Sequence, residues 1–128
     1  MEGLYKLQLS DFENCSHFPD AVARCSYHVD IHSPRGAGTQ LINIKPGQYY
    51  EIPYRCVVPR GCGNLTIGGR PISADVAVHS SLRIMPCVVS IGQGAGMGAA
   101  MAAEQGISPA DVDGCCVRKE LIKFGAHL

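Results

Sequence analysis

The spacing of hydrophobic and polar residues changes several times along this chain of 128 residues. Apolar and polar side chains alternate over residues 26–32, among β-branched residues, which predicts a strand. Two more extended segments, 39–45 and 48–54, flank Pro46-Gly47, a dipeptide that suits the centre of a tight turn. The pattern therefore predicts a β-hairpin over these two segments.

Shorter signals surround these strands. Residues 10–13 and 18–24 are each expected to form a turn of helix, and residues 33–38 have the composition of a loop at almost every position. An apolar run over 65–69 predicts a short buried strand. The chain shows no internal repeat and no low-complexity linker.

The last third of the chain is predicted to be helical. Residues 87–104 contain no proline beyond Pro86, which belongs to the first turn, and Gly106 ends the helix. Residues 108–111 begin a short turn, and 117–124 continue as an amphipathic helix. This order predicts an α+β fold: a small mixed or antiparallel sheet with two C-terminal helices.

Four glycines alternate with other residues in the predicted long helix: Gly92, Gly94, Gly96 and Gly98. Each costs an exposed helix about 1 kcal/mol relative to alanine, so we expect them to form a smooth strip against a closely packed backbone. The same glycines, after Val88-Val-Ser-Ile91, imitate the dinucleotide fingerprint Gly-x-Gly-x-x-Ala. No second strand ending in an acidic residue follows about twenty positions later, so this interpretation is rejected.

Charge and cysteine content narrow the function. Eleven basic residues balance eleven acidic ones, which argues against a nucleic-acid or membrane partner. No secretory signal or membrane-spanning run is present, so a cytoplasmic location is expected. The seven cysteines are odd in number and irregularly spaced, as expected of reduced thiols. His28 and His32 lie four apart but on a predicted strand, so no metal site is predicted.

Several short blocks in a fixed order, from about Gly3 to Gly125, carry a resemblance to a known family. The blocks are Phe18-x-Asp20-Ala-Val-Ala, Asp30-Ile-His32, Tyr50-x-Ile-Pro-Tyr-Arg55, Val58-Pro-x-Gly61, Asn64-Leu-x-Ile-Gly-Gly-Arg70, Ile72-Ser73, Arg83-x-Met-Pro86, Gly92-Gln-x-Ala-Gly96 and Ala99-Ala100. In these blocks the chain resembles the C-terminal portion of a family of FAD-dependent oxidoreductases, some of them labelled xanthan lyase-like. The family's N-terminal βαβ unit has no counterpart in these residues.

The resemblance implies different roles for the two halves of the chain. Residues 1–128 would be one fragment of a larger FAD-binding α/β protein, with about 1–63 on the substrate side. Residues of about 64–128 would supply the strand, loop and helix at the C-terminal end of the FAD-binding domain. The loop and the start of the helix would then close over the isoalloxazine ring.

The candidate cofactor-binding residues follow from that placement. A helix N-terminus stabilises an anion through its free amides, so the amides of Met85 and Cys87 are candidate donors to reduced flavin. Arg70 and Arg83 can add positive charge, and the hydroxyls of Ser73 and Ser81 can bond the ribityl chain or a backbone turn. The full set is Gly69, Arg70, Ser73, Ser81, Arg83, Met85 and Cys87.

Other roles stay open for these residues. Composition alone favours surface ion pairs for the arginines and capping for the serines, whereas the resemblance favours flavin for Arg70 and Arg83. No catalytic acid, base or nucleophile is assigned, although Asp30 and His32 form a candidate substrate-side pair.

The expected function is hydride transfer between FAD and a small organic substrate, carried out by the intact protein and not by the isolated chain. The expected partner is an N-terminal FAD-binding segment or a second copy of the chain. The alternative is a non-enzymatic interaction domain whose glycine-rich helix packs on a partner polypeptide.

Overall fold

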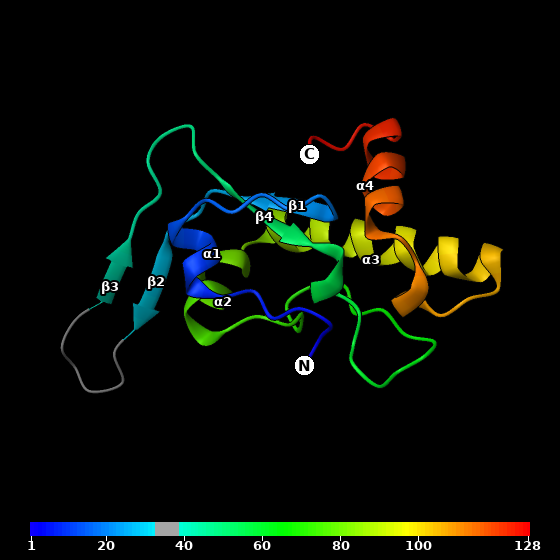
Figure 1. The fold of residues 1–128 in the computed structure, drawn as a ribbon. Coiled ribbons are helices and arrows are strands. Elements are labelled where there is room, and N and C mark those ends of the chain that lie inside the picture. The colour runs from blue at the N-terminus through cyan, green and yellow to red at the C-terminus, as the bar shows by residue number, and fades with distance from the viewer. Residues whose placement is uncertain (33–38) are drawn as a thin grey trace.

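The computed structural model describes residues 1–32 and 39–128, and it describes side chains outside residues 31–40. The predicted loop at 33–38 therefore lies outside the described residues. The elements follow one another from the N-terminus to the C-terminus as Figure 1 shows. They are α1 (Leu9–Glu13), β1 (Ala21–Cys25), β2 (Val29–His32), β3 (Thr39–Ile42), β4 (Tyr50–Pro53), η1 (Tyr54–Cys56), α2 (Val76–Leu82), α3 (Met85–Gln105), η2 (Pro109–Asp111) and α4 (Gly114–Lys123).

The strands form two small antiparallel sheets. β1 pairs with β4, with Cys25 opposite Tyr50, and β2 pairs with β3, with Val29 opposite Ile42. The long helix α3 packs on β1, while α4 packs on both α3 and β1, and α2 packs on β2 (Figure 1). Small antiparallel sheets with two C-terminal helices confirm the predicted α+β class.

The prediction of a hairpin over 39–54 is wrong about which strands pair. Its turn does form, because the Gln48 amide donates to the Lys45 carbonyl at 3.0 Å. The strands on either side do not pair with each other: β3 turns back onto β2, and β4 crosses to β1. All four residues of β4 are buried, whereas Leu41 of β3 is 56% exposed. The buried strand pairs with another buried strand, and not with its neighbour in sequence.

Two further predictions of local structure are wrong. The segment 18–24, expected to be helical, instead contributes most of β1, because Ala21, Val22 and Ala23 are all buried in the core against α3 and α4. Residues 65–69, expected to be a buried strand, form no regular element, and Leu65 is 45% exposed.

Helix α2 was not predicted. It lies between the predicted strand at 65–69 and the predicted long helix, and the Asp75 carboxylate caps it by accepting from the Val78 amide at 2.7 Å. The other Asp75 oxygen accepts from the Leu9 amide at 2.7 Å, which joins the start of α1 to the start of α2. A capping aspartate is a helix-start signal, and here it also fixes a contact between distant segments.

Helix α3 has the predicted boundaries. Pro86 lies in its first turn, and Gly106 ends it in the left-handed conformation at φ 66°. Residues 88–91 are helical, so the dinucleotide fingerprint is a coincidence of sequence, as inferred.

Side chains of this chain pack against two of the four glycines of α3, Gly94 and Gly98. A Cβ at Gly94 would lie 2.4 Å from Cβ of Val22, and one at Gly98 would lie 2.2 Å from Cε2 of Tyr54. A Cβ at Gly96 would meet nothing within 4 Å. The expected contact with a backbone is present at Gly92, whose Cα would lie 3.0 Å from a Cβ at Gly68. Gly94 and Gly98 instead accommodate side chains of the same chain.

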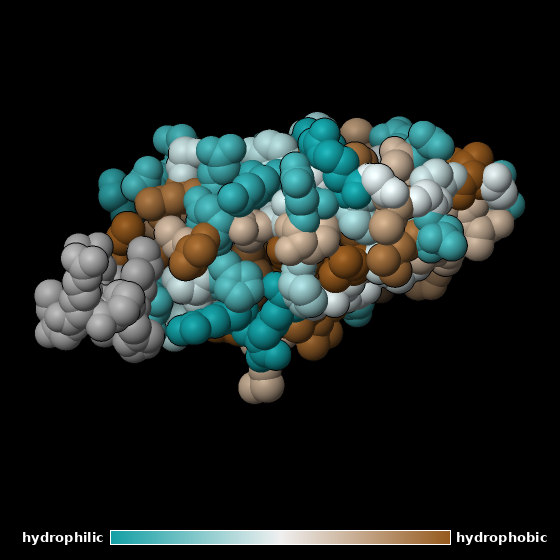
Figure 2. Space-filling view, turned by 90° about the horizontal axis from the view of Figure 1, so that it is seen from below, coloured by the Kyte–Doolittle hydropathy of each residue, from teal (hydrophilic) through white to brown (hydrophobic). Residues whose placement is uncertain are grey.

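One hydrophobic core joins the two halves of the chain, with members from Leu7 to Leu121. On the face seen in Figure 2, hydrophobic residues form separate small groups among hydrophilic ones. Within the described residues, no single helix has the length and apolar character to cross a bilayer. Together α2 and α3 meet that test, but they are bent by 99° at their junction.

Candidate functional site

The corner between α2 and α3 holds the N-terminus of the longest helix. Arg83 closes α2, and Ile84 precedes α3 in an extended conformation with no side-chain hydrogen bond to cap the helix. Pro86 brings no amide hydrogen, so the free donors of this turn are the backbone amides around Met85 and Cys87. The Met85 side chain is 74% exposed. The start of α3 is thus an uncapped donor site beside solvent.

The loop before α2 folds back onto this corner. Arg70 Nε donates to the carbonyl of Arg83 at 3.1 Å, and His79 Nε2 donates to the carbonyl of Arg70 at 3.0 Å. Gly69 has a φ of 103°, and a Cβ there would lie 3.8 Å from Cγ1 of Val88. The structure therefore brings Gly69, Arg70, Arg83 and Met85 together, although they are separated in sequence by α2.

The charge at this corner is positive. Arg70 and Arg83 are both exposed, and neither forms an ion pair with another described residue. The first turn of α3 contains no acidic residue. Two cations next to the positive end of a helix dipole favour an anion, or the electron-rich edge of a ring.

Three candidate side chains point elsewhere. The Ser81 hydroxyl is buried, donates to the Tyr27 carbonyl at 2.6 Å, and accepts from the Tyr50 hydroxyl at 2.9 Å. The Cys87 thiol is buried in the core, so only its backbone faces the corner. The Ser73 side chain is fully buried near Gly3, and its hydroxyl has no hydrogen-bond partner among the described residues. None of these three side chains is placed to contact a ligand at the corner. Of the three residues, Cys87 offers its backbone amide there.

A comparison with known protein families covers almost the whole chain. A model of the family described as FAD dependent oxidoreductase matches residues 1–121. The chain belongs to this family. Searches of curated proteins and of solved structures each gave no match.

The residues at the corner fit one part of the cofactor that this family uses. Uncapped amides and two arginines suit the electron-rich edge of the flavin ring. The described residues contain two antiparallel strand pairs and no parallel βαβ unit, which is the element that holds a dinucleotide pyrophosphate. In this family member, the described chain can therefore account for contacts with the ring and not for those with the adenosine half.

The sequence analysis did not identify an ion pair between a buried carboxylate and a half-buried arginine, Asp20 and Arg55. Arg55 Nε donates to Asp20 Oδ2 at 2.8 Å, and its Nη2 donates to Oδ1 at 3.1 Å. The Asp20 side chain is 8% exposed and that of Arg55 44%. The pair lines a cleft of about 470 Å³ together with Asp113 and Cys115. Both partners stand in blocks that carry the family resemblance, which was the available signal.

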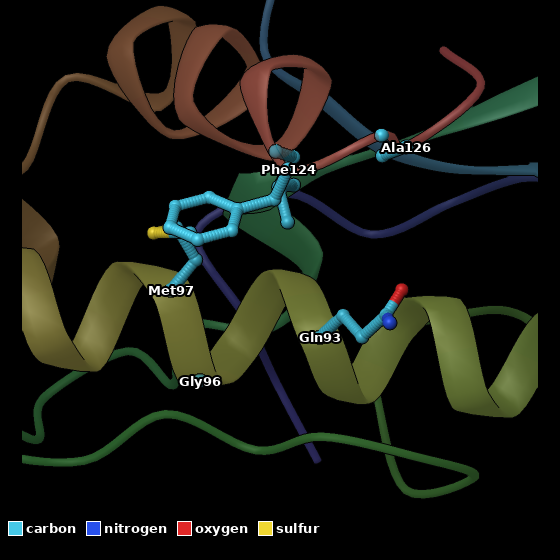
Figure 3. Close-up of a pocket in the computed structure, with 7 residues that line it drawn as sticks. Gln93, Gly96, Met97, Phe124 and Ala126 are labelled. Atoms are coloured by element: carbon cyan, nitrogen blue, oxygen red, sulfur yellow. The ribbon is translucent and has the colours of Figure 1, made fainter.

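A second cleft lies between α3, α4 and the C-terminal segment. It measures about 360 Å³ and is lined by Gln93, Gly96, Met97 and Phe124, among others. Figure 3 shows the Phe124 ring beside the Met97 side chain, above α3. Phe124 is 81% exposed. Gly96, where a Cβ would meet nothing within 4 Å, forms part of the floor of this apolar cleft.

The other candidate groups are the Asp30 and His32 pair and the possible metal ligands. The Asp30 amide donates to Ser80 Oγ at 3.0 Å, but the His32 side chain lies outside the part of the chain whose side chains are described. The suggested Asp30 and His32 pair therefore stays a prediction. All seven cysteines are free, and the described residues include no group of three or more His, Cys, Asp or Glu side chains that could hold a metal ion.

Proposed function

We propose that this chain supplies the flavin-facing corner of an FAD-dependent oxidoreductase, as the C-terminal part of the complete catalytic unit. The observation that carries the proposal is the uncapped start of α3, with Arg70 and Arg83 beside it. When bound, FAD supplies two-electron redox chemistry with a small organic substrate. The contacts to the adenosine half of the cofactor come from a βαβ segment outside these residues.

The corner residues have distinct tasks in this proposal. The Met85 and Cys87 amides donate hydrogen bonds to the electron-rich edge of the ring, and the charges of Arg70 and Arg83 favour its reduced, anionic form. The hydrogen bond from Arg70 to the Arg83 carbonyl holds the loop beside the helix start. Because Ser73 and Ser81 are buried, their part is to position the backbone.

Nuclear magnetic resonance on the ¹⁵N-labelled chain tests this assignment even if binding is weak. Adding FAD, oxidised and then reduced with dithionite, should shift the amide signals of Met85, Cys87 and Val88, and the reduced form should bind more tightly. Arg83→Gln should weaken binding about two- to fivefold, the effect of about 0.3–1 kcal/mol for a charge at a helix end. Arg60→Gln is the matched control, because Arg60 is an exposed arginine in a different part of the chain.

The proposal fails if the shifted signals lie elsewhere, or if Arg60→Gln weakens binding as much as Arg83→Gln. The alternative function, a glycine-rich helix that packs on a partner polypeptide, has weaker support. Val22 and Tyr54 of the same chain already occupy the space above Gly94 and Gly98. A partner could use only the open side, at Gly96 and the cleft beside Phe124.

A further inference from the structure

The apolar cleft beside Phe124 continues into a neighbouring cleft along α3. The neighbouring cleft measures about 320 Å³, and both clefts are lined by Gln93, Gly125 and Ala126. Figure 3 shows the Gln93 side chain on α3, below the C-terminal segment that holds Ala126. The two clefts therefore form one groove between α3 and residues 125–128.

The two ends of this groove differ in chemistry. The end beside α4 is lined by Met97, Leu121 and Phe124, and its floor is open at Gly96. The other end is more polar and is lined, among others, by Arg24 of β1. None of the described residues that line the groove carries a carboxylate side chain. A ligand that fills the whole groove is therefore apolar over most of its length and negatively charged at one end.

Arg24 brings unused hydrogen-bond donors to the polar end of the groove. Its side chain is 24% exposed and donates no hydrogen bond to any described residue. Its guanidinium lies 4.4 Å from the centre of the Tyr49 ring, and its Nε lies 3.8 Å from Oε1 of Glu51, which is too far for a hydrogen bond. Glu51 already accepts from the Phe18 amide at 2.8 Å and from Arg118 at 3.3 Å. A guanidinium in this state favours an anion with paired oxygens, such as a carboxylate.

We propose that this groove binds a free fatty acid of medium chain length. The carboxylate pairs with the Arg24 guanidinium, and the acyl chain runs along α3 over Gly96 towards Met97 and Phe124. Ser90, at the polar end, and Met97 are seven residues apart on α3, about 10 Å at the helical rise, which is the length of groove that the chain covers. Burial of the chain drives binding, and the ion pair fixes its direction.

A fatty acid is the occupant that matches both ends of the groove. An apolar protein surface, such as a helix face, would cover Arg24 without supplying an anion, and that costs the complex the hydration of the guanidinium. The flavin-facing corner takes no part in this site, because none of its candidate residues lines either cleft. Fatty-acid binding therefore stands or falls independently of the flavin proposal.

Isothermal titration calorimetry of the whole chain with decanoate, below its micelle concentration, tests the proposal. Decanoate should bind at a single site per chain, and octanoate should bind more weakly, by about fourfold for each methylene removed. Decanol, which has the same chain and no charge, should bind about tenfold or more weakly than decanoate. On the ¹⁵N-labelled chain, decanoate should shift the amide signals of Gln93, Gly96 and Ala126 and leave those of Met85 and Cys87 unchanged.

Two variants probe the two ends of the groove. Gly96→Leu places a side chain in the apolar end and should lower the affinity for decanoate about tenfold or more. The protein should stay folded, since the new Cβ meets nothing within 4 Å. Ala100→Leu, at an exposed position one turn further along α3, is its matched control and should bind normally. Arg24→Gln should lower the affinity for decanoate to that for decanol, whereas Arg60→Gln, at an exposed arginine elsewhere, should change neither.

Equal affinity for decanoate and decanol, unchanged binding by Gly96→Leu, or amide shifts outside the groove would each overturn the proposal. Binding of phosphatidylglycerol vesicles without binding of free decanoate would overturn it in favour of a lipid headgroup. A dimer in sedimentation, together with no binding of decanoate, would overturn it in favour of a second copy of the chain. Because the comparison of decanoate with decanol uses the unmodified chain, it decides the question even if Arg24→Gln fails to fold.

Discussion

Replacing Gly98 with alanine should destabilise the protein, although alanine is the better helix former. The new Cβ would lie 2.2 Å from Tyr54 Cε2 and 2.5 Å from its hydroxyl oxygen. Tyr54 is 2% exposed, and its hydroxyl donates to the Pro109 carbonyl at 3.0 Å. The ring is rigid, so it can move away only by disturbing the core and breaking that hydrogen bond.

The magnitude follows from three opposing contributions. Overpacking costs about 1–3 kcal/mol, and the lost hydrogen bond about 1 kcal/mol. The helix gains up to about 1 kcal/mol from alanine. The expected net loss for Gly98→Ala is about 1–3 kcal/mol, which corresponds to a fall in Tm of roughly 3–6 °C per kcal/mol for a domain of this size.

Gly96→Ala is the matched control on the same helix. A Cβ there meets nothing within 4 Å, so this variant should gain up to about 1 kcal/mol and raise Tm. Urea and thermal unfolding followed by circular dichroism measure both variants. Equal shifts for the two variants, or a rise in Tm for Gly98→Ala, would refute the assignment of Gly98 to the packed face of α3.

Three other predictions concern the whole chain. The chain purified alone should not retain FAD stoichiometrically, because the described residues hold no βαβ unit, and a flavin spectrum near one equivalent per chain would contradict this. We expect self-association through exposed apolar surface, so sedimentation should show a dimer or larger species that Phe124→Ser weakens; a monomer at high concentration would argue against it. The free energy of unfolding should fall as pH rises above about 9 towards 12. Burial raises the pKa of Cys56 from 9.0 to about 12 and that of Tyr54 from 10.0 to about 12, so the unfolded chain loses these protons first. Cys56→Ala should make this decline shallower in urea titrations on either side of pH 9, and an unchanged slope would contradict the assignment.

The long helix and its ends could be predicted from the sequence, because the signals that set them are local. Pro86 fixes the backbone of the first turn, and Gly106 takes up the left-handed conformation that ends the helix. The candidate donors at the start of α3 could be located for the same reason: free amides follow from where a helix begins. The same holds for the turn at Pro46-Gly47, which forms as predicted.

Strand pairing and side-chain direction were decided by the tertiary structure. β4 pairs with β1, and not with β3 beside it in sequence, because the other buried strand, which packs on α3 and α4, comes from a distant segment. The family resemblance likewise suggested the Ser81 hydroxyl as a partner for the ribityl chain, whereas hydrogen bonds with Tyr27 and Tyr50 hold that hydroxyl in the core. The sequence pattern also could not predict which glycines of α3 contact a side chain. Val22 and Tyr54 lie against Gly94 and Gly98 only because the sheet packs on the helix. Local geometry is encoded within a few residues, but contacts between distant segments depend on the whole core.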